Sequence, residues 1–164
     1  MNKIIVIGCP GSGKSVFSRA LHEKTRIPLY CLDMMYWNTD KTTVGREIFR
    51  ARLAEVLAKD SYIIDGNYQS TMETRIEKCD TVFFLDYDLE TCLSGVLARR
   101  GKPREDMPWI ETEEDPEFMQ TIKAYIPEQR PRVLALLEKH KDKNIVVFKS
   151  REESTKYLES LLSS

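Results

Sequence analysis

The sequence predicts an α/β fold in which a parallel sheet is covered on both faces by helices. Two observations lead to this prediction. Short apolar runs alternate regularly with segments of helical periodicity along the chain, which is the pattern of repeated strand–helix units. The length of 164 residues is enough for one α/β core and short for two. We therefore expect a single domain over residues 1–164.

The elements follow one another in a regular order. The first strand is expected over residues 3–7, and the helix after it over residues 14–25, with its apolar residues on one face: Val16, Phe17, Ala20 and Leu21. Further strands are expected at residues 28–32, 61–65, 81–86 and 144–148. Helices are expected between and after them at residues 44–59, 69–78, 88–100, 117–140 and 152–162.

Two stretches depart from this alternation. Pro127 and Pro131 lie inside the 117–140 helix, where a proline kinks or splits a helix because it lacks an N–H group. Residues 101–116 contain three prolines and show no periodicity. We expect this second stretch to be a small lid inserted into the domain.

Composition narrows the classes of protein to consider. No apolar run approaches the length of about 18 residues that a membrane helix needs. The 25 Lys and Arg residues are balanced by 26 Asp and Glu residues, which argues against a nucleic-acid partner because cationic contacts to phosphates supply most of that affinity. The chain begins in a strand without a secretory signal pattern. We expect a cytoplasmic protein that is a monomer or a weak homodimer.

Residues 8–15 read GCPGSGKS, which matches the phosphate-loop pattern GxxxxGK[ST]. Glycines allow the backbone to curl around an anion so that N–H groups converge on it, and the following helix would point its positive N-terminus at the same anion. An ordinary Gly/Ser turn is the alternative, but the strand before and the helix after favour a phosphate loop. The expected nucleotide-binding residues are Gly8, Pro10, Gly11, Ser12, Gly13, Lys14, Ser15 and Val16.

Two of these residues have a specific expected role. Lys14 would reach the β- and γ-phosphates and act in catalysis, and the Ser15 hydroxyl would be a ligand of Mg²⁺. The motif therefore predicts a nucleotide and Mg²⁺ as ligands.

Acidic residues mark the ends of three of the predicted strands. Open α/β sheets bind ligands at the carboxyl ends of their strands; Asp65 and Asp86 are the last residues of two predicted strands, and Asp33 directly follows a third. Asp86 has the position of a Walker B acid, which steadies Mg²⁺ through water. Taken singly, each Asp is also typical of a helix cap or a turn. Taken together beside a phosphate loop, they favour a functional site.

The arginines favour a small phosphotransferase over other nucleotide-binding classes. The DxxG and NKxD motifs of GTPases do not occur in the sequence, and ABC or AAA+ ATPases are larger. Phosphotransferases use arginines from a closing lid to stabilise the transferred phosphoryl group. Arg100 and Arg104 flank the start of the expected lid and Arg130 follows it, and we expect all three to be catalytic. The alternative is that they are solvated charges at helix ends.

Several segments together resemble one known family. The phosphate loop, LDMMYW at residues 32–37, DGNY at 65–68, the Leu-Asp of the fourth strand, RRGKPRED at 99–106 and EQRPRV at 128–133 are similar to the FlaR-related topology modulation proteins. That family belongs to the adenylate-kinase-like and shikimate-kinase-like P-loop group. The resemblance covers residues 3–150 and implies a three-layer P-loop NTPase fold with strand order 2-3-1-4-5, ATP as the nucleotide, and a lid that closes over it.

The resemblance also implies roles for individual residues. It puts the loop Lys149-Ser150-Arg151 near the adenine, with Ser150 and Arg151 as nucleotide-binding residues. It also makes Asp33 the residue that holds an acceptor hydroxyl and accepts its proton. Tyr36 and Trp37 would wall the acceptor pocket, or they would form a packing pair. Further contacts to the acceptor are expected from Asp65, Gly66, Asn67 and Tyr68.

Two classes of function stay open at this point. The first is a kinase that transfers the γ-phosphate of Mg-ATP to a small-molecule acceptor, which would be a nucleoside, a nucleotide or a small hydroxyl compound. The second is a nucleotide-binding regulatory or DNA topology modulation protein with little phosphotransfer.

Overall fold

A computed structural model describes residues 1–99 and 116–161 of the chain. Five parallel strands form one sheet in the order β2-β3-β1-β4-β5, so the predicted fold class and strand order are confirmed. The strands are β1 (Lys3–Gly8), β2 (Leu29–Cys31), β3 (Tyr62–Asp65), β4 (Thr81–Leu85) and β5 (Asn144–Phe148).

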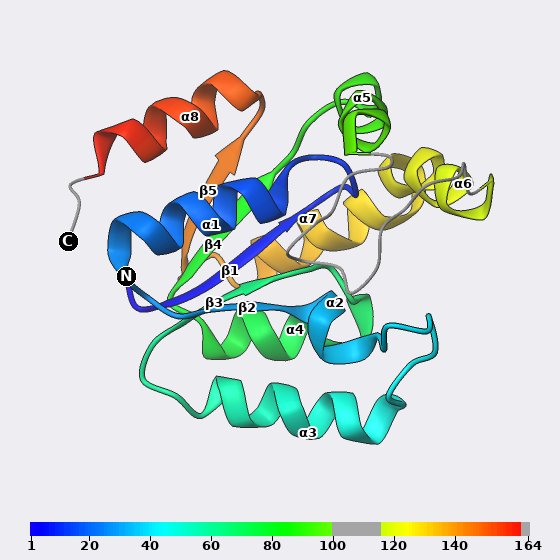
Figure 1. The fold of residues 1–164 in the computed structure, drawn as a ribbon. Helices are drawn as coiled ribbons and strands as arrows, with labels where there is room; N and C mark the ends of the chain where they lie inside the picture. The colour runs from blue at the N-terminus through cyan, green and yellow to red at the C-terminus, as the bar shows by residue number, and fades with distance from the viewer. Residues whose placement is uncertain (100–115, 162–164) are drawn as a thin grey trace.

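Helices lie on both sides of the sheet (Figure 1). Helices α3, α4 and α7 pack against one face, while α1 and α8 pack against the other. The helical segments are α1 (Lys14–Thr25), α2 (Leu32–Tyr36), α3 (Arg46–Leu57), α4 (Gln69–Lys78), α5 (Leu89–Arg99), α6 (Pro116–Ala124), the π-helical η1 (Tyr125–Gln129), α7 (Arg130–Lys139) and α8 (Arg151–Ser160). None of these helices combines the length and the apolar composition that crossing a bilayer requires.

The central strand is buried on both faces. In β1, Ile4 and Val6 belong to one buried cluster, Ile5 and Ile7 belong to the other, and all four are 0% exposed. Successive side chains of a strand point to opposite faces of the sheet, so a continuous apolar run is required wherever both faces are covered. Each such side chain contributes about 1.5–3 kcal/mol on burial.

The second strand is shorter than predicted. It ends at Cys31 rather than at residue 32, and the unpredicted helix α2 begins at Leu32. The reason is its position at the edge of the sheet, where β2 pairs with β3 alone among the described strands and Cys31 is in register with Asp65, the last residue of β3. Beyond Cys31 the neighbouring strand offers no further backbone partner, so the chain satisfies its own groups by turning into a helix.

The prediction that prolines divide the 117–140 helix is confirmed. Pro127 lies inside the π-helical segment η1, between α6 and α7, and widened turns of this kind are one way to accommodate a disrupted helical ladder. Pro131 is in the first turn of α7, directly after the π-helical segment, and the first turn is the part of an α-helix where proline is best tolerated.

The loop between β1 and α1 touches the backbone of α5. Gly11 has φ +87°, and a Cβ atom added there would lie 2.0 Å from the Cys92 carbonyl oxygen. A Cβ atom on Gly95 would lie 2.1 Å from the Gly11 carbonyl oxygen. Only glycine at both positions allows the loop and the helix to approach so closely.

We expect Gly95→Ala to destabilise the protein. Alanine is normally better than glycine in a helix interior by about 1 kcal/mol, but here the contact with Gly11 should reverse the sign and lower the free energy of unfolding by about 1–3 kcal/mol. Urea denaturation measures this change. Ser94→Ala, at the exposed neighbouring position, is the matched control, with an expected change of less than about 0.5 kcal/mol. A stability gain in Gly95→Ala would contradict the close contact.

Candidate functional site

All five strands end at one edge of the sheet, and the predicted site residues gather there. Gly8 is in register with Leu85 and Leu85 with Phe148, so the residues that follow these strands are neighbours. On the other side of β1, Val6 is in register with Asp65 and Asp65 with Cys31. The phosphate loop, residues 8–15, therefore leaves the centre of the edge with an acidic residue on each side.

The backbone of the phosphate loop is curled as the motif requires. Gly13 has φ +92°, a left-handed conformation that L-residues rarely adopt, and the Ser12 N–H group donates to the Cys9 carbonyl 3.0 Å away. The Lys14 ammonium group donates to the same carbonyl at 3.3 Å. The Ser12 hydroxyl is buried and has no hydrogen-bond partner among the described residues. A buried unpaired donor in such a loop suits an anion with several oxygens.

Arg151 lies against one side of the phosphate loop. Its guanidinium group donates to the Gly11 carbonyl at 3.2 Å and lies 5.8 Å from the centre of the Tyr87 ring. Ser150, its neighbour, caps α8 through its side-chain oxygen, which accepts from the Glu153 N–H group at 3.2 Å. The predicted adenine contacts of Ser150 and Arg151 stay predictions.

A cleft of about 360 Å³ lies between the loop and α5. The residues of α5 that line it have small side chains, which leave the space beside the loop open, and Arg151 also lines it. Its lining is Gly11, Gly13, Ser15, Val16, Ser94, Gly95, Ala98 and Arg151.

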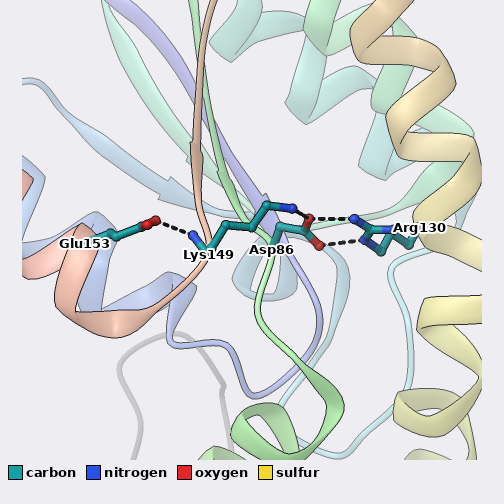
Figure 2. Close-up of polar contacts among 4 residues, drawn as sticks. All are labelled: Asp86, Arg130, Lys149 and Glu153. Carbon is teal, nitrogen blue, oxygen red and sulfur yellow. Dashed lines mark hydrogen bonds and ion pairs between the residues drawn. The ribbon is translucent and has the colours of Figure 1, made fainter.

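Asp86 is the centre of an ion-pair cluster beside the loop (Figure 2). Its side chain is only 4% exposed, and its two oxygens accept from Arg130 Nε at 2.7 Å and Arg130 Nη2 at 2.9 Å. Lys149 Nζ donates to the second oxygen at 2.6 Å. Burial opposes ionisation, but these hydrogen bonds hold the pKa of the Asp86 carboxyl below its ordinary value.

The cluster brings together Asp86, Arg130 and Lys149, for which the sequence predicts different roles. The structure places Arg130 against Asp86 at the sheet edge, and its catalytic role stays a prediction. Asp86 as a Mg²⁺ ligand also stays a prediction, since both of its oxygens are paired with cations. Lys149 was expected near the adenine, which stays a prediction; its pairing with Asp86 was not predicted, although Lys149 follows the last strand just as Asp86 follows the fourth.

Asp33 lies on the other side of the loop and is paired with a tyrosine. The Tyr68 hydroxyl donates to Asp33 Oδ1 at 2.5 Å. Burial and the Asp33 charge raise the pKa of Tyr68 far above its ordinary value, so the phenol keeps its proton and remains a donor. The pair fixes the direction of one Asp33 oxygen.

Tyr36 and Trp37 belong to an aromatic cluster with Phe49 and Tyr68. Their ring centres lie 5.1–5.5 Å apart along the chain of contacts Trp37–Tyr36–Phe49–Tyr68, mostly in tilted or edge-on geometry. Tyr36 and Trp37 are both partly exposed. They pack on one another, and their expected role as walls of an acceptor pocket stays a prediction.

The segment 65–68 is tied to the phosphate loop. The Asn67 side-chain amide donates to the Gly8 carbonyl at 2.6 Å and accepts from the Gly8 N–H group at 3.2 Å. Asp65 is 5% exposed at the end of β3, and a Cβ atom on Gly66 would lie 2.8 Å from Leu32 Cδ1. Acceptor contacts from Asp65, Gly66, Asn67 and Tyr68 stay predictions, and the Asn67 amide already has a backbone partner.

Arg75 is a residue that the sequence analysis missed. It lies beneath the 65–68 segment and is 0% exposed. Its spacing on α4 could have indicated burial, because Arg75 lies on the same helical face as the apolar residues Met72 and Ile76, which are also buried.

A further cleft of about 590 Å³ runs from Ser15 along the free edge of β2. Its lining is mostly apolar: Ser15, Arg19, His22, Pro28, Leu29, Tyr30, Cys31, Met34 and Met35. Arg100, Arg104 and residues 101–115 of the expected lid lie outside the described residues.

Comparison with known proteins agrees with the fold. No family model matches the chain. The adenylate kinase of Encephalitozoon cuniculi (strain GB-M1) is 28% identical over 125 residues, which are 64% of this chain and 71% of that protein.

Two solved structures are similar over nearly the whole chain. Shikimate kinase from Bacteroides thetaiotaomicron has a TM-score of 0.56 and 19% identity, with 95% of this chain and 93% of that chain covered. Shikimate kinase from Acinetobacter baumannii in complex with shikimate has a TM-score of 0.62 and 16% identity, with 97% and 92% covered. These similarities show a shared P-loop kinase fold.

We expect the contribution of Asp86 to stability to depend on pH. Because its pKa is lowered in the folded state, this contribution is complete above its ordinary value of 3.8 and is lost as the pH falls through the lower folded-state pKa. Asp86→Asn should therefore cost about 2 kcal/mol at pH 7 and progressively less in acid. Denaturation at a series of pH values measures this. The exposed Asp60→Asn is the control, and an equal loss at all pH values would contradict the ion-pair account.

Proposed function

We propose that this protein is a P-loop kinase that transfers the γ-phosphoryl group of Mg-ATP to a small acceptor, which is a nucleoside, a nucleotide or a small hydroxyl compound. The main support is the position of the phosphate loop between the Asp33–Tyr68 pair and the Asp86–Arg130–Lys149 cluster at one sheet edge. The similarity to an adenylate kinase and the fold of two shikimate kinases support the same class of reaction.

The phosphates of the nucleotide would lie on residues 8–15. The left-handed glycines curl the backbone there, and the buried Ser12 hydroxyl has no partner in the part of the chain that the structure describes. Helix α1 begins at Lys14 with its positive end toward the loop. On binding, Lys14 would exchange the Cys9 carbonyl for phosphate oxygens, which are stronger partners for an ammonium group. The base would occupy the 360 Å³ cleft against α5, which Arg151 lines, and Ser150 would contact the base from the position before Arg151.

The residues present also fit a magnesium ion next to the phosphates. Ser15 offers a hydroxyl at the start of α1 and Asp86 a carboxylate, which are oxygen donors of the kind that Mg²⁺ prefers. When bound, Mg²⁺ neutralises charge on the phosphates. Lys149, whose side chain is 61% exposed, is free to leave Asp86 for solvent or phosphate at small cost.

Asp33 would act as the general base for the acceptor. The acceptor hydroxyl oxygen forms a bond to the γ-phosphorus as the bond from that phosphorus to the β-phosphate oxygen breaks, so that ADP leaves. The hydroxyl proton goes to Asp33, whose carboxylate is oriented by the Tyr68 hydroxyl. Tyr36 and Trp37 would wall the acceptor, and contacts would come from Asp65, Gly66, Asn67 and Tyr68.

Arg130 would stabilise the transferred phosphoryl group. Asp86 holds its guanidinium group through two hydrogen bonds, and this preorganisation lowers the cost of presenting a positive charge to developing negative charge. We assign Arg100 and Arg104 the same role from a lid formed by residues 101–116. We further propose a single-domain, cytoplasmic protein of the FlaR-related family that is a monomer or weak homodimer.

Release of ADP from Mg-ATP tests the proposed function. We expect one of four acceptor pools (nucleosides, nucleoside monophosphates, sugars, small hydroxy acids) to stimulate the wild type, and Lys14→Ala to lower that rate by about 10³-fold or more. Lys24→Ala, at the other end of α1, is the control. A slow rate that no pool stimulates would favour the regulatory alternative over a kinase.

Asp33→Asn separates catalysis from binding. It keeps the shape of the side chain but cannot accept the proton, so we expect kcat to fall by about 10²–10⁴-fold while the affinity for MgADP changes by less than about twofold. Asp40→Asn, in the exposed loop after α2, should leave both quantities unchanged. Unchanged turnover in Asp33→Asn would exclude Asp33 as the base.

A further inference from the structure

Arg75 is a fully buried cation for which the proposed reaction has no direct use. Its side chain is 0% exposed within α4, and burial lowers the pKa of its guanidinium group to about 10, so it is charged at neutral pH. Burying a charge costs several kcal/mol of desolvation free energy, and well-placed hydrogen-bond partners offset about that amount. An apolar side chain of similar size would serve the core at least as well, so the charge calls for another explanation.

The donors of Arg75 converge on one short segment. Nη1 donates to the Gly66 carbonyl at 2.9 Å, and Nη2 donates to the carbonyls of Asn67 and, at 3.2 Å, Tyr68. Nε donates to the Thr71 hydroxyl at 3.2 Å. Three successive carbonyls pointing at one guanidinium group fix the backbone of residues 66–68, including the left-handed conformation of Tyr68 at φ 36°.

The side chains of this segment reach both halves of the site. Asn67 is paired twice with the backbone of Gly8, where the phosphate loop begins. Tyr68 is hydrogen-bonded to Asp33. A shift of residues 66–68 would therefore move the anchor of the phosphate loop and the orientation of the proposed base together.

We propose that Arg75 is a positioning residue that couples the phosphate loop to Asp33 through residues 66–68. The predicted effect of Arg75 on Asp33 rests on the proposed function. The predicted effect of Arg75 on the phosphate loop concerns nucleotide binding, which is measurable without turnover. Lysine at this position would keep the charge but cannot spread donors over three carbonyls.

A double-mutant cycle on MgADP affinity tests the coupling, with calorimetry in the absence of any acceptor. We expect Arg75→Lys and Asn67→Ala each to weaken MgADP binding about tenfold, and the double variant to be no more than about threefold weaker than either, because both changes release the same anchor. In nuclear magnetic resonance experiments the Gly8 amide should exchange faster in Arg75→Lys, while amides of β4 stay protected. Arg50→Lys, on the exposed face of α3, is the control.

The outcomes distinguish coupling through residues 66–68 from a contribution of Arg75 to protein stability alone. Additive losses of about a hundredfold, or an unchanged Gly8 amide, would overturn the proposal. If Arg75→Lys does not fold, Thr71→Val replaces it in the same cycle, since it removes one acceptor of Arg75 and keeps the charge. A non-additive cycle in a protein that phosphorylates no acceptor would support the coupling and reject the kinase. When turnover is found, the same non-additivity in kcat is expected for Arg75→Lys with Tyr68→Phe.

Discussion

The pairing of β1 with β3 on one side and β4 on the other is the constraint on which the site depends. Because all the strands are parallel, their carboxyl ends share one edge, and the phosphate loop leaves from the centre of that edge. Every polar residue that follows a neighbouring strand is then within reach of the loop. The sheet itself needs no polar residues for this arrangement, since β1 is held by apolar burial on both faces.

Charge is distributed unevenly around the loop. On the β4 and β5 side, the buried Asp86 forms ion pairs with Arg130 and Lys149, so two cations lie next to the place where phosphates would bind. On the β3 and β2 side, the described groups include the carboxylates of Asp65 and Asp33, with the Arg75 guanidinium group buried beneath residues 66–68. This arrangement suits a reaction in which the donor carries the negative charge and the acceptor gives up a proton.

Much of the fold could be predicted because its signals are local. The glycine spacing of residues 8–15, the apolar runs of the strands and the positions of Pro127 and Pro131 each act over a few residues, and the structure has the expected strand, loop, helix or interruption at each of them. The helix at Leu32–Tyr36 was not predicted, because its start depends on where the paired strand β3 ends.

The contacts that were not predicted share a physical reason. Lys149 and Asp86 are 63 residues apart, and they meet only because β4 and β5 are neighbours. Arg75 was missed because an arginine on a charged helix normally faces solvent, and its partners are backbone carbonyls that no sequence pattern marks. The Asn67–Gly8 pair was missed for the same reason. The sequence therefore predicted which residues lie at the sheet edge better than the contacts between them.

Binding of nucleotide phosphates to the loop at the centre of the sheet edge can be measured by chemical-shift mapping with the magnesium complex of the β,γ-imido analogue of ATP, a ligand that is not consumed. If the phosphates bind there, the largest amide shifts occur at residues 11–15, with smaller shifts at Asn67, Lys149 and Gly95. Saturating ligand without shifts at these residues, or with shifts confined to the cleft along β2, would exclude phosphate binding at the loop.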